Sequence, residues 1–377
     1  AADSSGWPSP WKPWERGAIE PLVLEAKVGR GEQIAPEEGE VILRATAERF
    51  SGPLRRPAPV VVEKRVAVRL TPPSLQLLSS QHYVRQGGAG LVVARIGETA
   101  IRSGVVAGEE EFLSYPVPGA AESERLTLFG VPWNVADPSR VRLFAEDDAG
   151  NRSELAFIDL LAASPPRRDT IDLPDSFLER VVPAIESRTP TLTGKGPLIE
   201  RYLEINGPLR AQNRQRIAEL SRDSRQDFLW KGAFLQLPNS QVRARYAETR
   251  TYRYQGRAVD TQTHLGLDVA SLARAEAPAP NDGRVVYAEY LGIYGNVVVL
   301  DHGFGLLSLN AHLSSIDVAV GQDVIKGETI GRSGATGLAG GDHLHLGIFV
   351  QGTAVDPVQW IDAKWIRDNI GTKIRLP

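Results

Sequence analysis

Short runs in which apolar and polar residues alternate recur along this chain, and proline or glycine bounds them. Such runs lie at 40–50, 60–70, 91–96 and 141–145. A period of two is typical of β-strands that bury one face, because successive side chains point to opposite sides. We therefore expect residues 1–72 and 73–163 to form two small β-sandwich modules, of which the first could be incomplete.

The pattern changes after Pro165 and Pro166, where the alternation stops. Asp175 is a candidate helix cap. The apolar residues that follow it at helical spacing are Phe177, Val181, Val182 and Ile185. A longer helix is expected at 207–221. These features predict a helical connector over residues 164–230.

Beyond Gly232 the period returns to two and the glycine content rises. Strand candidates lie at 285–288, 296–300 and 345–350. We expect an antiparallel β domain over residues 231–362 and a C-terminal tail over 363–377. The whole chain is expected to be mainly β and multidomain, because 377 residues exceed the roughly 100–150 typical of one domain.

The composition is that of an ordinary globular protein, with 42% hydrophobic and 24% charged residues. A net charge of −3 gives no electrostatic reason to expect nucleic acid as a partner. No apolar run approaches the ~18–20 residues of a transmembrane helix, so none is expected in this chain. The small, polar residues 1–5 are typical of a sequence just after signal-peptide cleavage, although a cloning boundary would look the same.

Cysteine is absent, so any metal site must be built from histidine and carboxylate. Five of the six histidines fall between positions 264 and 345. Four of these five form three patterns in order: His264 four residues before Asp268, His312 before leucine, and His343 two residues before His345. A hydrolytic zinc site needs about three protein ligands and an open position. Residues two apart on a strand share a face. One histidine of the last pair could therefore bind metal while the other takes part in catalysis beside it.

Each histidine alone is more often a structural residue than a ligand, but their joint occurrence in one small domain favours a site. His82 lies outside that domain, and we interpret it as structural. His302 stands at a strand-to-turn corner and is interpreted as a local hydrogen-bonding residue.

The stretch from 244 to 362 resembles the catalytic domain of the lysostaphin-type zinc endopeptidases, a family that includes many peptidoglycan hydrolases. The matching stretches are 264–268, 295–303, 311–314, 320–327, 331–337 and 341–346. The resemblance implies that His264, Asp268 and His345 bind one Zn²⁺ per chain. It also implies that His312 and His343 are the catalytic histidines. Which of them is the general base, and which stabilises the oxyanion or leaving amine, stays open.

The resemblance further implies an endopeptidase that hydrolyses peptide cross-links or bridges of bacterial peptidoglycan, in the periplasm or outside the cell. Peptidoglycan peptides would be its partners, with a regulatory protein as a possible second partner. Polyglycine bridges and meso-diaminopimelate cross-links are both compatible with such a centre. One departure is Asn310, because the family commonly has an aromatic residue two positions before the central histidine, where it bears on substrate contacts near His312.

Other interpretations remain. The domain could be a metal-free scaffold that activates another wall hydrolase. The hairpin around Lys326 could resemble a lipoyl or biotinyl carrier, but that gives the histidines no role. The glycine-rich stretch 331–341 could suggest a phosphate-binding loop, but it lacks the Gly-Lys-Ser/Thr ending of such a loop. The connector could restrain the catalytic cleft or only brace the domains.

Overall fold

The computed structural model of this protein describes residues 37–47, 58–374 and 376. The chain divides into two compact units, Ala1–Leu70 and Thr71–Pro377. In the first unit, β1 (Gly39–Ala47) and β2 (Val60–Val68) form an antiparallel hairpin. The remainder of the β module expected over 1–72 lies outside the described residues.

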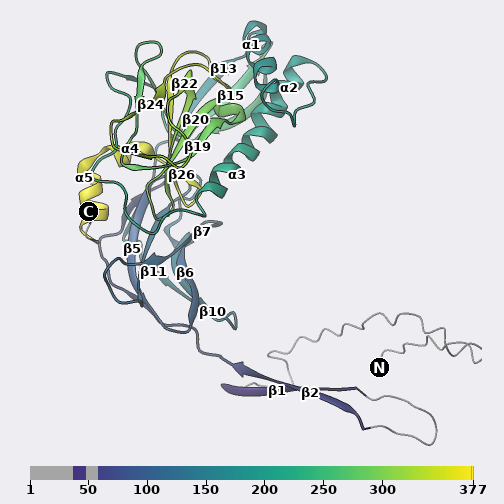
Figure 1. The fold of residues 1–377 in the computed structure, drawn as a ribbon, viewed down its shortest axis with the longest axis vertical. Helices are drawn as coiled ribbons and strands as arrows, with labels where there is room; N and C mark the ends of the chain where they lie inside the picture. The colour runs from purple at the N-terminus through teal and green to yellow at the C-terminus, as the bar shows by residue number, and fades with distance from the viewer. Residues whose placement is uncertain (1–36, 48–57, 375, 377) are drawn as a thin grey trace, which may run out of the picture. The chain divides into compact units, whose positions relative to one another are not determined.

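The second unit begins with two four-stranded sheets, which lie in the lower part of this unit in Figure 1. The first sheet has the order β3 (Leu75–Leu77), β5 (Ala89–Ile96), β9 (Glu124–Gly130) and β8 (Tyr115–Pro116). The second has the order β11 (Arg152–Ala156), β10 (Val141–Asp147), β6 (Ala100–Ala107) and β7 (Glu110–Leu113). The short strands β4 (Tyr83–Arg85) and β12 (Leu160–Ala162) pair in parallel, and η1 (Pro138–Arg140) precedes β10.

The two sheets bury a common core that does not stop at the end of this module. Leu91 and Leu128 from the first sheet and Leu143 from the second pack in one cluster with Ile348 and Trp360 of the C-terminal domain. The module over 73–163 is therefore tied to the C-terminal domain by shared apolar contacts.

The C-terminal domain is built on the eight-stranded sheet that the described residues form, and its strands run antiparallel. In spatial order they are β14 (Gln241–Ala244), β17 (Leu267–Ala270), β25 (Leu344–Val350), β21 (Leu306–Leu313), β20 (Asn296–Asp301), β19 (Gly283–Tyr290) and β23 (Asp323–Val324), with β26 (Thr353–Val355) paired to β25. A smaller sheet contains β18 (Glu276–Pro278), β24 (Thr329–Arg332) and β22 (Ser315–Ile316). The expected mainly β, multidomain fold is confirmed.

The connector contains the expected helices and one strand that the sequence pattern did not predict. Its helical elements are α1 (Asp175–Glu186), α2 (Leu198–Glu204), the π-helical turn η2 (Ile205–Leu209) and α3 (Arg210–Leu220). The strand is β13 (Arg167–Asp172), which pairs in parallel with β15 (Glu248–Tyr254), and β15 pairs with β16 (Arg257–His264). Most residues of β13 are exposed, so it carries no apolar alternation to reveal it.

The helices α1, α2 and α3 gather on one side of the C-terminal β layers (Figure 1). Val181, Val182 and Ile185 of α1 are buried in a core that also contains Tyr252 of β15 and Val297 of β20. The connector thus contributes to the core of the C-terminal domain.

Residues 363–377, expected as a tail, also contribute to a core. They contain α5 (Ala363–Ile366) and the π-helical turn η4 (Arg367–Gly371), which follow α4 (Pro357–Ile361). Ile366 and Ile370 are buried in the cluster shared with the β module. Among the described residues, no helix is both long and apolar enough to cross a membrane.

Candidate metal centre and cleft

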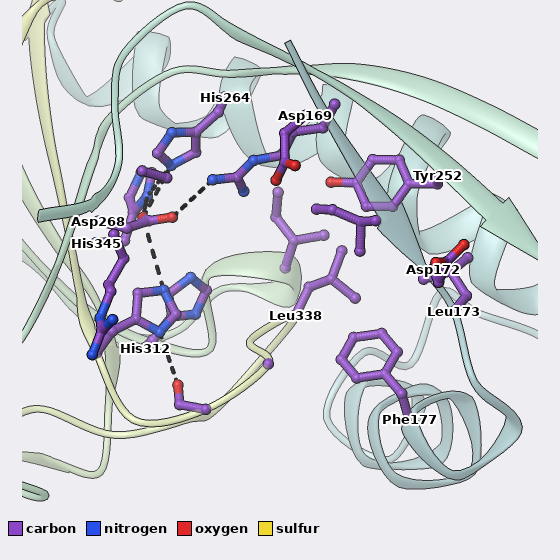
Figure 2. A pocket seen from close by; sticks show the side chains of 18 of the residues that line it. Asp169, Asp172, Leu173, Phe177, Tyr252, His264, Asp268, His312, Leu338 and His345 are labelled. Carbon is purple, nitrogen blue, oxygen red and sulfur yellow. Dashed lines mark hydrogen bonds and ion pairs between the residues drawn. The ribbon is translucent and has the colours of Figure 1, made fainter. Parts of the chain in front are cut away.

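Three side chains from three strands converge in the C-terminal domain. His264 ends β16, Asp268 lies on β17 and His345 lies on β25, where the register pairs it directly with Asp268. Oδ1 of Asp268 is 3.0 Å from Nε2 of His264 and 2.8 Å from Nδ1 of His345, and these two nitrogens are 3.1 Å apart. Figure 2 shows the three side chains pointing toward one another. All three are buried.

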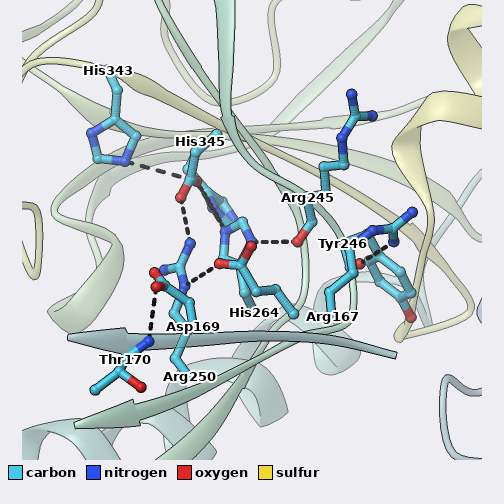
Figure 3. Close-up of polar contacts among 11 residues, drawn as sticks. Arg167, Asp169, Thr170, Arg245, Tyr246, Arg250, His264, His343 and His345 are labelled. Atoms are coloured by element: carbon cyan, nitrogen blue, oxygen red, sulfur yellow. Dashed lines mark hydrogen bonds and ion pairs between the residues drawn. The ribbon is translucent and has the colours of Figure 1, made fainter. Parts of the chain in front are cut away.

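Hydrogen bonds fix the orientation of the two rings in this cluster. Nδ1 of His264 donates to the Arg245 carbonyl at 3.0 Å (Figure 3), which directs Nε2 of this ring toward Asp268. Burial lowers the pKa of His345 to about 4, so this ring is neutral at pH 7. Burial alone would raise the pKa of the Asp268 carboxyl, but the rings of His264 and His345 hold that pKa well below its ordinary value.

Two imidazole nitrogens and one carboxylate oxygen fit a divalent cation such as zinc. The three candidate ligand atoms all lie within 4.8 Å of one another. Gly266 permits this approach, because a Cβ there would lie 2.3 Å from Cε1 of His345. His264, Asp268 and His345 therefore form a possible metal site of the mixed imidazole and carboxylate kind.

His312 reaches the same site through an irregularity in its strand. Between the register pairs Asn296 with Leu313 and Val298 with Asn310, β21 has one residue more than β20, which is a β-bulge. His312 lies in this bulge with a φ of 62°, in the left-handed region. The bulge turns its ring toward His343 and His345, whose ring centroids are 4.7 and 5.9 Å away.

His312 and His343 are held in the same way. Nδ1 of His312 donates to the Thr336 carbonyl at 2.8 Å, and Nδ1 of His343 donates to the Gly341 carbonyl at 2.8 Å. When an imidazole held in this way is neutral, its Nε2 can accept a proton or a hydrogen bond. Burial, together with the rings of His343 and His345, lowers the pKa of His312 well below 6.5. Nε2 of His343 lies 3.8 Å from Oδ1 of Asp268.

Arg250 of β15 was not predicted as a site residue. Its Nη2 donates to Oδ2 of Asp268 at 3.0 Å, and its Nε donates to Oε1 of Glu248 at 3.0 Å. The arginine therefore bonds to one carboxylate oxygen of Asp268, and the two histidines contact the other. No spacing rule links an arginine to a ligand 18 residues later, so the sequence carried no signal for this contact.

The five predicted residues lie along a cleft of about 930 Å³. The cluster of His264, Asp268 and His345 lies with His312 at one end, and residues of the connector line the other, as Figure 2 shows. The connector residues of the lining include Ile171, Leu173, Phe177, Arg180 and Tyr202. The contribution of β13 to this wall was not expected, because that strand was not predicted.

The remaining polar candidates lie elsewhere and have local partners. Nδ1 of His302 bonds to the Asp282 carbonyl and its Nε2 to the Ser308 hydroxyl, in agreement with the expected local role. Nε2 of His82 bonds to the Ser79 hydroxyl. The Lys326 ammonium donates to the Ala233 carbonyl. Asn310 is fully buried and is not part of the cleft lining.

A cleft with two imidazoles and a carboxylate at one end has a possible metal site of the kind that hydrolytic enzymes use. Residues 262–357 match Peptidase family M23, and the chain carries a domain of this family at its C-terminal end.

Curated relatives match the same part of the chain. The murein hydrolase activator EnvC of Escherichia coli is 38% identical over 96 residues, which are 26% of this chain and 23% of that protein. The DD-carboxypeptidase/endopeptidase Mpg of Neisseria meningitidis is 39% identical over 95 residues, covering 25% of this chain and 22% of that protein. The peptidoglycan DD-endopeptidase ShyA of Vibrio cholerae is 38% identical over 96 residues, covering 26% of this chain and 22% of that protein. This chain thus spans under a quarter of the length of these relatives.

Two solved structures are similar in part. The catalytic domain of lysostaphin from Staphylococcus simulans is 29% identical, with a TM-score of 0.29, and the alignment covers 33% of this chain and 94% of that one. A putative peptidase M23 from Pseudomonas aeruginosa is 22% identical, with a TM-score of 0.44, over 73% of this chain and 93% of that one.

Proposed function

We propose that this protein is a zinc-dependent endopeptidase that hydrolyses peptide cross-links or bridges of bacterial peptidoglycan. The observation that carries the proposal is the convergence of His264, Asp268 and His345 beside two further histidines in one cleft. The donor set is complete for a three-ligand site with an open position. One Zn²⁺ per chain is expected.

His264, Asp268 and His345 would hold the ion. When bound, zinc supplies Lewis acidity, which polarises a carbonyl and acidifies water. The protein itself supplies two imidazoles, His312 and His343, whose Nδ1 atoms are fixed by backbone carbonyls. Their Nε2 atoms can take a proton from water, return it to a leaving amine or, once protonated, stabilise an oxyanion. The two histidines are similarly held, so either order of these roles is chemically open.

The substrate class is supported by the names of two relatives. Both are named as endopeptidases, and one of the two names includes peptidoglycan. A cleft of about 930 Å³ is large enough for several residues of a peptide. An enzyme of this kind would act in the periplasm or outside the cell. Peptidoglycan peptides are then its partners.

The test combines metal content with hydrolysis. Purified protein should contain one zinc per chain and release soluble fragments from peptidoglycan. His345→Ala should lose both properties, because two protein ligands hold zinc poorly. The matched control is His82→Asn, a buried histidine outside the cleft, which should keep both. Full zinc occupancy in His345→Ala would refute the ligand assignment.

A second candidate function is that of a scaffold that activates another wall hydrolase. The observation that favours it is the 38% identity to a protein named as a murein hydrolase activator. A scaffold of this type needs neither zinc nor the two held histidines. Protein that is free of zinc, inactive on peptidoglycan and able to stimulate a separate hydrolase would select this function instead.

A further inference from the structure

Three tyrosines that line the cleft have hydroxyl groups without a hydrogen-bond partner among the described residues. They are Tyr202, Tyr252 and Tyr294, and their exposed fractions are 1%, 6% and 7%. Hydroxyls at the wall of a cleft can bond to water or to a ligand. In Tyr246, the same group donates to the Ala354 carbonyl at 2.6 Å. The cleft tyrosines therefore leave hydrogen-bonding capacity that a ligand in the cleft can use.

Tyr202 and Tyr252 belong to the end of the cleft that the connector lines. Their ring centroids are 6.1 Å apart, and Phe177 of α1 lies 6.5 Å from the ring of Tyr202. Ile171 of β13 is directly opposite Tyr252 in the sheet. Figure 2 shows Tyr252 and Phe177 on one side of this space and Leu338 of the glycine-rich loop across from them. Except for Leu338, these residues lie outside 262–357, the segment that matches the family.

Two of the charged groups at this end are already engaged. Asp172 accepts two hydrogen bonds from the Arg253 guanidinium, at 2.9 and 3.1 Å. Arg180 donates to the Ala339 carbonyl at 3.1 Å and lies over the ring of Phe177. Burial raises the pKa of Tyr202, so its hydroxyl stays neutral and can both donate and accept. The surface offered to a ligand is thus mostly apolar, with tyrosine hydroxyl groups and the exposed carboxylate of Asp169.

We propose that this connector-lined end is a substrate subsite for an extended peptide with small alkyl side chains. The hydroxyls of Tyr252 and Tyr202 bond to backbone amides of the peptide, and Ile171, Phe177 and Leu338 pack against its alkyl groups. The proposal rests on the proposed peptidase function and narrows its substrate. Alanine-containing stem peptides fit the subsite better than polyglycine bridges, since glycine has no group to pack against the apolar wall.

The test is binding of tetra-alanine and tetraglycine to the full zinc-loaded chain, by calorimetric titration at up to millimolar peptide. Mass spectrometry checks that the peptides stay intact during the titration. Tetra-alanine should bind more tightly, by about fourfold for each methyl group that packs in the subsite. Tyr252→Phe should weaken the binding of both peptides about three- to tenfold, because it removes only the hydroxyl.

Tyr254→Phe is the matched control. Tyr254 lies two residues along the same strand, its hydroxyl already bonds to Asp175, and it is not part of the cleft lining. This variant should bind both peptides like the unchanged protein. Equal affinity for the two peptides, no binding of either, or an unchanged affinity in Tyr252→Phe would overturn the subsite.

Hydrolysis of peptidoglycan is measured separately in the same preparations. Selective peptide binding without hydrolysis would leave the subsite standing and remove the proposed enzymatic function. Hydrolysis with equal binding of the two peptides would support the enzymatic function and remove the subsite.

Discussion

Nη2 of Arg250 donates to Oδ2 of Asp268 at 3.0 Å, and the two side chains are only 18% and 10% exposed. This contact holds the carboxylate so that Oδ1 of Asp268 faces His264 and His345. Partners that orient a metal ligand typically contribute about 10–100-fold to metal affinity. We therefore expect Arg250→Met to weaken zinc binding by about that factor, measured by competition with a chelator.

Arg253→Met is the control for this prediction. Arg253 lies on the same strand, but its guanidinium pairs with Asp172 and is 45% exposed. Its loss should leave zinc affinity unchanged, because exposed ion pairs contribute little. Equal zinc affinity in Arg250→Met and the unchanged protein would show that Asp268 needs no support from the arginine.

His312 should separate catalysis from metal binding. Its ring faces the cluster, but His264, Asp268 and His345 already supply a full ligand set. His312→Ala is expected to keep its zinc and to lose about 10²–10⁴-fold in peptidoglycan hydrolysis, the usual range for a general acid or base. Zinc content and the rate of fragment release are measured on the same sample. A variant that hydrolyses at the native rate would exclude His312 from the chemistry.

The sequence predicted the parts of this structure that depend on local pattern. The mainly β fold followed from alternation, and the buried face of α1 followed from the helical spacing of Val181, Val182 and Ile185. The five site residues were identified from motifs, and they do meet in one cleft.

What the sequence did not show depends on contacts between distant segments. The strand β13 is polar, and only its pairing with β15 makes it a strand. The bulge that turns His312 toward the cluster arises from the register between β20 and β21. Arg250 acquires its role from the packing of β15 beside Asp268. None of these relationships leaves a periodic signal along the chain.

Asn310 should be a source of instability. It is fully buried, and neither its side-chain oxygen nor its nitrogen has a hydrogen-bond partner among the described residues. Its neighbours in the sheet are the buried residues Val298 and Leu346. Because an unpaired buried amide costs about 1–3 kcal/mol, Asn310→Leu is expected to raise the free energy of unfolding by about 1–2 kcal/mol.

Denaturant unfolding measures this difference. Asn296→Leu on the adjacent strand is the control, since its amide donates to the Leu313 carbonyl at 3.0 Å. That substitution removes a made hydrogen bond and should lower stability. A loss of stability in Asn310→Leu as well would mean that the amide has a favourable role in the core.

The buried, neutral ring of His302 should make the protein less stable in mild acid. Burial lowers its pKa to about 4, against an ordinary value of 6.5. The unfolded chain therefore binds a proton that the folded chain does not, and stability falls as the pH drops from about 6.5 to about 4. Between pH 7 and pH 5 this residue should account for about 2 kcal/mol of the loss. His302→Asn should show a smaller loss by that amount, and equal losses in the two proteins would contradict the assignment.

The helical connector supports the C-terminal domain more than the sequence suggested. Leu178, Val182 and Ile185 of α1 share a core with Tyr252 and other residues of the C-terminal domain. A chain beginning near residue 228 would lose these contacts and the strand β13. Such a truncation would therefore unfold part of the cleft. It would not show whether the connector restrains hydrolysis in the cleft or only braces the domains.

A point substitution can separate them. Arg180 of α1 donates to the Ala339 carbonyl in the loop that leads to His343, and this is the contact through which α1 would hold a closed cleft. We expect bracing, so Arg180→Met should hydrolyse peptidoglycan at a rate equal to or below that of the unchanged protein. Arg188→Met is the control, because Arg188 lies over the ring of Tyr290, outside the cleft lining. If α1 instead restrains the enzyme, Arg180→Met will be several-fold faster while Arg188→Met is unchanged.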